Sequence, residues 1–220
     1  MSDRCLLYYI TDRSQFCGDE PTRIHSLLAK VAEAARAGVE YIQLREKDLS
    51  IRELETLARQ VVERVRENST STRLLINSRT DVALAAGADG VHLRVEDVAP
   101  HEVRLMMEIC GHRPCPSTTD HFLVAASCHS QEEVIRAESE AVDFAVFAPV
   151  FGKSNAPGVQ PTGIDALREA CRAKIRVFAL GGVTLENAAA CLKAGAAGVA
   201  GIRLFQENKI EEVVHALRAL

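Results

Sequence analysis

The hexapeptide AGVEYI at residues 37–42 returns in recognisable form as AGADGV at residues 86–91 and as AGAAGV at residues 194–199. A weaker copy, AVDFAV, occupies residues 141–146. Each copy follows a stretch with helical patterning and opens a stretch with strand patterning. In the first three copies the glycine at the second position stands where a left-handed residue commonly ends a helix. The copies recur about every 50 residues, which is the length of two strand–helix units. This pattern predicts a repeated β/α architecture.

The alternate units complete the pattern. The candidate strands lie at about 5–11, 40–45, 73–77, 90–94, 122–128, 143–148, 175–180 and 198–202. The candidate helices lie near 22–37, 51–67, 80–86, 100–109, 131–140, 164–173, 185–194 and 209–219. Strands that alternate with amphipathic helices pair in parallel through crossovers. We therefore predict an α/β protein, a single (β/α)8 TIM barrel over residues 1–220, with a doubly wound open sheet as the alternative.

The composition limits the partners. The formal charge of −4 gives no basic surface for nucleic acid, and only 5% of the residues are aromatic. No apolar run approaches the roughly 20 residues that span a bilayer. Seven scattered cysteines favour reduced thiols in the cytoplasm. Cys110, His112, Cys115 and His121 form the one tempting metal cluster, but their spacing matches no common zinc site closely.

In a barrel of this type the chemistry sits on the loops that follow the strands. Along the second strand, Gln43, Arg45 and Lys47 are two residues apart and so share one face while the chain stays extended. Inward cations on a barrel strand need an anionic partner. We favour an anion site here, and the alternative is a solvated cluster in which Glu46 and Asp48 pair with the two cations.

Other strand ends supply further candidates. Asn77 ends the third strand, where its amide can bind a ligand or cap the next helix. Asp97 follows the fourth strand and can be a metal ligand or a helix-capping acid. Ser127 and His129 share a face at the end of the fifth strand, from which Cys128 points away. His129 is a candidate proton-transfer residue because an imidazole titrates near neutral pH, with helix capping or packing as its alternative.

The last two strands point to a phosphate. Gly181 and Gly182 follow the seventh strand, and Gly201, Ile202 and Arg203 follow the eighth. Glycines let backbone N–H groups approach a phosphate closely, and these two loops form the common phosphate site of such barrels. Close helix packing is the alternative reading of the glycines. A long loop at 149–163 has the composition of a lid.

Five segments of the chain resemble the thiamine phosphate synthase family and its relative, the thiazole tautomerase. They are YITD at 9–12, YIQLREK at 41–47, LIN at 75–77, GVHL at 90–93 and GG at 181–182. The resemblance covers nearly the whole chain in the right order, and QLREK is its most specific part. It implies the barrel fold independently of the repeats.

The resemblance also implies a reaction. Synthases of this family join a pyrimidine diphosphate to a thiazole phosphate and release pyrophosphate with Mg²⁺. The C–O bond ionises to a pyrimidine methyl cation, which the thiazole nitrogen attacks. The residues that would hold the pyrimidine diphosphate are Gln43, Arg45, Lys47 and Asn77. Those at the thiazole phosphate would be Gly182, Ile202 and Arg203, beside Gly181 and Gly201.

The chain departs from the family at the metal. Synthases usually have Asn-Asp where this chain has Asn77-Ser78, so one Mg²⁺ carboxylate is missing, whereas Asp97 matches the other. Arg94-Val95 stands where Gly-Gln is usual. Loss of a hard oxygen ligand should weaken the binding of Mg²⁺, whose octahedral shell tolerates little change.

The lid segment departs as well. The family motif is Pro-Thr-x-Thr-Lys, but this chain has GKSNA at 152–156. Ala156 takes the position of the family lysine. Lys153 is a candidate to replace it from a shifted position, and Asn155 is a second candidate for substrate binding.

Three functions follow as hypotheses. The first is a thiamine phosphate synthase-like transferase that acts on phosphorylated pyrimidine and thiazole molecules in the cytoplasm. The second is a thiazole tautomerase-like isomerase, which needs no Mg²⁺ and would use His129 as general acid and base beside Ser127. The third is a non-catalytic barrel that binds a phosphorylated metabolite. We expect no nucleic acid and no membrane as partners, and a homodimer is the candidate assembly.

Overall fold

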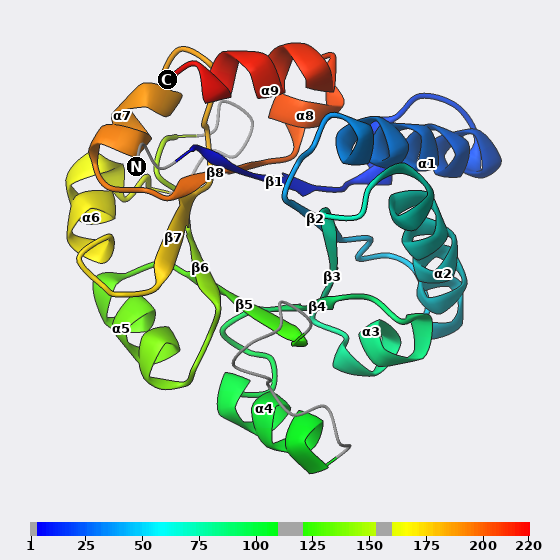
Figure 1. Cartoon of the computed structure of the whole chain (residues 1–220), viewed down its shortest axis with the longest axis horizontal. Helices are drawn as coiled ribbons and strands as arrows, with labels where there is room; N and C mark the ends of the chain where they lie inside the picture. Colours follow the sequence, from blue (N-terminus) through cyan, green and yellow to red (C-terminus); the bar gives the residue numbers. More distant parts are fainter. Residues whose placement is uncertain (1–3, 110–120, 153–159) are drawn as a thin grey trace.

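The computed structural model describes residues 4–109, 121–152 and 160–220, and its strands form a closed parallel barrel in the order of the sequence (Figure 1). The strands are β1 (Leu6–Ile10), β2 (Tyr41–Leu44), β3 (Arg73–Asn77), β4 (Gly90–Leu93), β5 (Leu123–Cys128), β6 (Phe144–Phe147), β7 (Arg176–Ala179) and β8 (Gly198–Gly201). The predicted (β/α)8 barrel is confirmed and the open sheet is wrong, because β8 pairs with β1.

A ring of helices surrounds the barrel (Figure 1). The helices are α1 (Glu20–Arg36), α2 (Ile51–Asn68), α3 (Thr80–Ala86), α4 (Pro100–Ile109), α5 (Gln131–Ser139), α6 (Gly163–Ala170), α7 (Ala188–Lys193), α8 (Arg203–Gln206) and α9 (Ile210–Arg218), with a 3-10 turn η1 (Arg13–Gln15) after β1. The single turns α8 and η1 are absent from the prediction, because three or four residues carry no detectable helical period.

Local sequence explains where the helices begin and end. Ser50 caps α2 by accepting a hydrogen bond from the Glu53 amide, and the Glu53 carboxylate accepts one from the Ser50 amide. This reciprocal capping box satisfies two amides that a helix start otherwise leaves open. At the other end of a unit, Gly38, Gly87 and Gly195 have φ angles of +78°, +71° and +104°. The left-handed helix ends predicted from the repeated glycines are confirmed.

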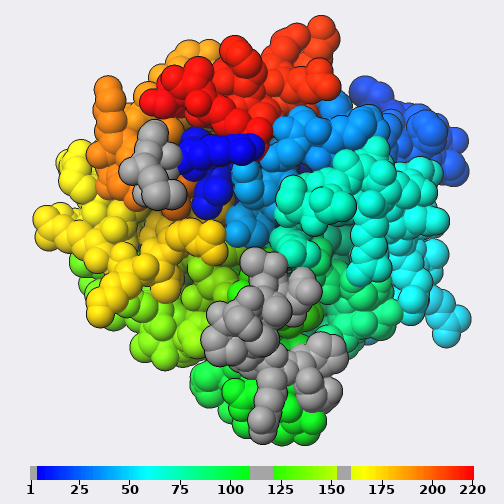
Figure 2. All heavy atoms as spheres, in the orientation of Figure 1, coloured from blue at the N-terminus to red at the C-terminus, as the bar shows by residue number. Residues whose placement is uncertain are grey.

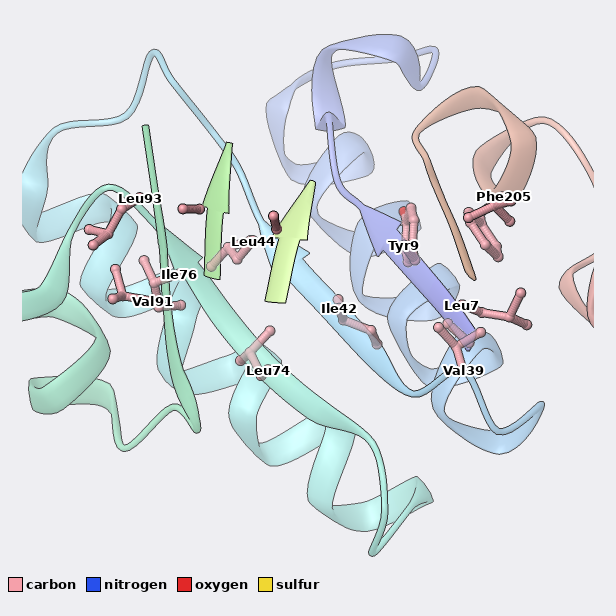
Figure 3. Packing of buried hydrophobic residues seen from close by; sticks show 14 of the residues in the cluster. Leu7, Tyr9, Val39, Ile42, Leu44, Leu74, Ile76, Val91, Leu93 and Phe205 are labelled. Atoms are coloured by element: carbon pink, nitrogen blue, oxygen red, sulfur yellow. The ribbon is translucent and has the colours of Figure 1, made fainter. Parts of the chain in front are cut away.

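The strands alternate between two faces. Ile42 and Leu44 of β2 point outward, and Figure 3 shows them in line with Leu74 and Ile76 in the apolar layer that the helices cover. Tyr41 lies in the separate cluster that fills the barrel interior. Alternate residues of β2 therefore face opposite sides of the sheet, as the prediction of an inward Gln43 assumed.

The barrel closes where the two ends of the chain meet. A Cβ atom on Gly198 would lie 2.0 Å from the Leu6 carbonyl oxygen, so only glycine allows β8 to approach β1 this closely. Nearby, Glu40 accepts a hydrogen bond from the Leu7 amide and forms an ion pair with Arg218 of α9 at 3.0 Å. Figure 2 shows the N-terminal segment against the C-terminal segment on the surface.

The structure bears on two questions from the sequence, a membrane span and the candidate zinc cluster. None of the helices in the described part combines the length and apolarity that a bilayer crossing requires. Of the candidate zinc cluster, residues 110, 112 and 115 lie outside the described residues, whereas His121 Nε2 lies 2.6 Å from a carboxylate oxygen of Asp143.

Candidate functional site

Aromatic rings fill the middle of the barrel. Tyr8, Tyr41, Phe144 and Phe178 contact one another, and the closest ring centroids, those of Tyr41 and Phe144, are 4.8 Å apart. All four side chains are buried. A small molecule therefore has no passage through the barrel, and polar groups can meet a ligand only at the ends of the strands.

A chain of buried hydrogen bonds crosses the interior next to these rings. Gln43 Nε2 donates to the Tyr8 hydroxyl at 3.0 Å, and that hydroxyl lies 3.1 Å from His92 Nδ1. His92 Nε2 lies 2.8 Å from Ser127 Oγ. A neutral imidazole with its proton on Nε2 satisfies every link, since the Tyr8 hydroxyl then donates to Nδ1. Four strands thus contribute one side chain each, from β2, β1, β4 and β5.

His92 is held neutral. Burial is the main cause that lowers the pKa of His92, to about 3, and the nearby Arg45 cation lowers it further against an opposing effect of Asp97. Burial likewise raises the pKa of the Tyr8 hydroxyl far above its usual value. Neither group exchanges protons near neutral pH, so the chain orients the Gln43 amide rather than supplying an acid or a base.

This burial predicts a pH-dependent stability. Below a pH of about 6.5 the unfolded chain binds a proton at His92 that the folded chain does not bind until pH falls to about 3. The unfolded state then binds more protons, so acid lowers the free energy of unfolding by up to about 1.4 kcal/mol per pH unit from this group. Urea unfolding between pH 7 and 4 should show a steeper decline for the natural protein than for His92→Gln. Parallel pH profiles would contradict the assignment.

The hydroxyl of Tyr8 should stabilise the same network. Tyr8→Phe leaves both the Gln43 amide and His92 Nδ1 without that partner, so we expect the free energy of unfolding to drop by about 1–3 kcal/mol. Tyr9→Phe is the matched control. The Tyr9 hydroxyl donates to Gln206 Oε1 at 3.2 Å, but that oxygen also accepts from the Asp12 amide. Denaturant unfolding should show the smaller loss for Tyr9→Phe, and equal losses would contradict the network's role.

Arg13 pairs with both carboxylates that stand beside Arg45 and Lys47 in the sequence. Glu46 and Asp48 both pair with Arg13, whose Nη1 lies 3.1 Å from Glu46 and 2.7 Å from Asp48. Both carboxylates are therefore engaged by Arg13, and among the described residues neither forms an ion pair with Arg45. Arg13 escaped the sequence analysis because a lone arginine after a strand carries no motif.

Arg45 is left as an available cation. It is half-buried, and its backbone amide donates to Thr11 Oγ1 at 3.0 Å. Within residues 4–109, 121–152 and 160–220 no carboxylate forms an ion pair with its guanidinium. Its charge acts on buried His92, which places it beside the Gln43 network. Lys47 is exposed and lies beyond the end of β2.

The ends of β3 and β4 hold a second polar group. Asn77 and His92 are register partners, and Asn77 Nδ2 donates to Ser78 Oγ at 3.0 Å. Ser78 has a φ of +62°, in the left-handed region. Asn77 does not cap α3, since the residue at that helix's N-cap is Arg79.

Asp97 closes the turn after β4. Its Oδ2 accepts from the Arg94 amide at 2.7 Å, and its Oδ1 accepts from Arg94 Nη2 at 3.1 Å. Burial acts to raise the pKa of Asp97, but hydrogen bonds from Arg94 and Ser78 outweigh it and hold that pKa below the usual value. Asp97 is therefore an ionised partner of an arginine, which neither sequence-based reading anticipated.

Ser127 and His129 are engaged in different places. Ser127 contacts His92 inside the barrel, whereas His129 is exposed and its Nδ1 lies 2.6 Å from the Ala148 carbonyl oxygen. Cys128 is buried in the outer apolar layer, as predicted from the alternation. Ser127 and His129 therefore form hydrogen bonds with different partners, and their catalytic roles stay predictions.

The two glycines after β7 adopt left-handed backbone angles and lie against the segment 149–152. Gly181 and Gly182 have φ angles of +94° and +64°, and a Cβ on Gly182 would lie 2.8 Å from the Gly152 carbonyl oxygen. Packing against the 149–152 segment accounts for both glycines. Ile202 packs on the interior cluster, and Arg203 is exposed. Lys153 and Asn155 lie outside the described residues.

Fold and site together define a class: a (β/α)8 barrel with a sealed aromatic interior and polar side chains at the carboxyl ends of its strands. The family model described as thiamine monophosphate synthase matches residues 7–205. The chain therefore belongs to the thiamine monophosphate synthase family, as its motifs predicted.

Individual relatives of this chain carry names from the same family. The chain is 42% identical over 217 residues to a protein of Geobacter sulfurreducens provisionally named thiamine-phosphate synthase, a match that covers 97% of this chain and 93% of that one. A thiamine-phosphate synthase of Methanoculleus marisnigri is 35% identical over 215 residues, covering 96% and 93%. Among solved structures, a thiamine phosphate pyrophosphorylase from Pyrococcus furiosus has a TM-score of 0.77 at 29% identity, covering 99% and 95%.

Proposed function

We propose that this chain is a thiamine-biosynthesis transferase that joins hydroxymethylpyrimidine diphosphate to (carboxy)thiazole phosphate with release of pyrophosphate. Family membership supports the reaction class. One observation supports our assignment of this reaction to the mouth of the barrel. Arg45 is a half-buried cation without an ion pair among the described residues, and it stands next to the oriented amide of Gln43.

The pyrimidine diphosphate would occupy the side of the mouth formed by β2, β3 and β4. Gln43 is held in one orientation by Tyr8, so its remaining amide atoms can contact the substrate without a loss of side-chain entropy on binding. Arg45 and Lys47 supply positive charge for the diphosphate, and Asn77 supplies an amide. Lys153 and Asn155 stay predictions for the same substrate.

The thiazole phosphate would lie on the opposite side of the mouth. Leu180 and Ile202 present an apolar surface there, which suits a thiazole ring. The backbone amides of Gly182 and Ile202 and the exposed Arg203 side chain would bind its phosphate, with Gly181 and Gly201 allowing close approach of the backbone. The two substrates would thus meet above the aromatic layer.

The residues promote the reaction mainly through charge. The C–O bond between the pyrimidine methylene and the diphosphate breaks, and its electron pair stays on the departing oxygen. The thiazole nitrogen then donates its lone pair to the methylene carbon, which forms the C–N bond. A carboxylated thiazole would in addition release its carboxyl group as CO2, with the electron pair of the broken C–C bond staying on the ring. Fixed cations beside the departing oxygen stabilise the negative charge as it develops. No residue needs to remove a proton, in keeping with the neutral, buried His92.

One assay tests this function. The protein is incubated with both substrates, with and without Mg²⁺, and thiamine phosphate and pyrophosphate are quantified. We expect both products in equal amounts. Absence of thiamine phosphate under both conditions would overturn the proposal. The tautomerase and the non-catalytic barrel are not favoured, because the relatives are named as synthases and His129 contacts a backbone carbonyl. A cytoplasmic location and a homodimer stay predictions.

A further inference from the structure

The guanidinium of Arg94 lies between the two groups at which the family resemblance implies a Mg²⁺ site. Its Nε donates to Ser78 Oγ at 2.8 Å and its Nη2 donates to Asp97 Oδ1 at 3.1 Å. The Arg94 amide takes the second carboxylate oxygen, Asp97 Oδ2, at 2.7 Å. Both oxygens of the carboxylate therefore accept hydrogen bonds from a single arginine.

This arrangement does not fit a magnesium ion. Mg²⁺ requires near-octahedral oxygen ligands at about 2.0–2.1 Å and is usually bound through one or two carboxylates. Here one position is the neutral hydroxyl of Ser78, and the Asp97 carboxylate at the other is paired with a positive charge. In the described part of the chain no three acidic, histidine or cysteine side chains gather as a metal would need. A divalent ion would have to displace Arg94 against charge repulsion.

Arg94 keeps capacity for a second anion. Apart from Asp97, the one carboxylate near it in the described residues is Glu96, 3.9 Å from Nη1, and the Glu96 side chain is 82% exposed. An ion pair so exposed to solvent contributes little. The Arg94 side chain is itself 46% exposed, so its outer nitrogens can be reached. A guanidinium anchored on one edge and open on the other can bind phosphate oxygens with good geometry.

The position matches the diphosphate side of the mouth. Arg94 follows β4 two residues after His92, and Ser78 follows β3 directly after Asn77. Arg45 directly follows β2, the strand that pairs with β3, and its charge acts on His92. The two arginines thus stand at the ends of β2 and β4 with Asn77 between them.

We propose that Arg94 replaces the divalent cation at this rim, so that the protein binds the diphosphate group through fixed guanidinium charges without a metal. The inference rests on the proposed function of the site. When the C–O bond breaks, Arg94 and Arg45 would balance the charge on the departing pyrophosphate, a part that a metal otherwise plays. Ser78 and Asp97 act as positioning residues that hold the guanidinium in place.

Calorimetric titration with inorganic pyrophosphate in buffer containing EDTA tests the proposal. We expect the natural protein to bind pyrophosphate there, and Arg94→Gln to bind it about 10–100-fold more weakly, since charge-assisted hydrogen bonds are lost. Arg168→Gln is the control, because Arg168 pairs with Asp165 on the surface of α6. Binding that requires Mg²⁺, no binding at all, or unchanged binding by Arg94→Gln would overturn the proposal.

Metal binding gives an independent readout. Manganese titration followed by electron paramagnetic resonance should detect no site in the natural protein and one site in the double variant Ser78→Asp/Arg94→Gly. Aspartate tolerates the left-handed backbone of position 78, so the substitution suits the fold. Manganese bound by the natural protein and lost in Asp97→Asn would overturn the proposal, and so would a double variant that folds, by its circular dichroism, without gaining a site.

The outcome separates this proposal from the proposed function. Metal-free pyrophosphate binding that depends on Arg94, in a protein that makes no thiamine phosphate, would support the guanidinium site and reject the synthase reaction. Thiamine phosphate formation that stops in EDTA would support the synthase reaction and reject the metal-free guanidinium site.

Discussion

Replacing Arg45 with alanine should lower kcat/KM for thiamine phosphate formation by about 10²–10³-fold, the loss typical of removing one fixed group that stabilises developing charge. Arg45 is half-buried at the mouth of the barrel and forms no ion pair with the described residues. Its charge is therefore available to a substrate rather than used by the fold. Initial rates at varied concentrations of pyrimidine diphosphate measure the effect.

Two further variants show whether charge or shape matters. Arg45→Lys keeps the charge but loses the planar fork that matches phosphate oxygens, so we expect a smaller loss, of about 10-fold. Arg59→Ala removes an arginine from the exposed face of α2, where it pairs with Glu55, and should change nothing. Thermal unfolding of Arg45→Ala should match the natural protein. A kcat/KM within threefold of the natural value would show that the cation has another purpose.

The barrel could be predicted from sequence because its signals are local and repeated. The AG-containing copies mark helix ends that adopt left-handed φ angles, and the alternation around Gln43 correctly separates the inner from the outer face of β2. Both patterns depend on neighbours within a few residues. Strand β3 was predicted over the residues that it occupies.

The site was only partly predictable, because its groups meet across strands. The inward position of Gln43 was predicted correctly. Its partner Tyr8 lies 35 residues before it, and His92, which contacts Tyr8, lies 49 residues after it, and no motif in either segment predicts these contacts. Ser78 and Arg94 were noticed as departures from a family pattern. The hydrogen bonds of the Arg94 side chain to Ser78 and Asp97 could be found only in the structure, because Ser78 and Arg94 follow different strands.

The second large effect concerns Arg13. Arg13→Met should lower the free energy of unfolding by about 3–5 kcal/mol, because a buried carboxylate then loses its cation. The Glu46 side chain is 2% exposed, and of its hydrogen-bond donors in the described part of the chain the Thr11 hydroxyl and the Arg13 backbone amide would remain. Urea unfolding at pH 7 measures the loss. Arg59→Met is the control, since its exposed pair with Glu55 contributes at most about 1 kcal/mol.

The pH dependence of the loss identifies its cause. Burial raises the pKa of Glu46 even in the natural protein, where hydrogen bonds and Arg13 act against it. Without Arg13 that pKa rises further, so the folded variant binds a proton that the unfolded chain does not bind until lower pH. Acid therefore favours the folded variant, and the difference from the natural protein should shrink between pH 8 and pH 5. A difference independent of pH would mean that lost packing, rather than an unpaired charge, destabilises the variant.

Glu46→Gln in the Arg13→Met background completes the argument, because it removes the unpaired charge and should recover part of the lost stability. The same carboxylate accepts from Thr11 at 2.6 Å, and Thr11 in turn accepts from the Arg45 amide at 3.0 Å. The Arg13–Glu46 ion pair thus supports, through Thr11, the backbone of Arg45 at the mouth of the barrel. We therefore expect Arg13→Met to lower kcat/KM as well, with recovery in the double variant, whereas an unaffected rate would show that Arg45 is positioned without this support.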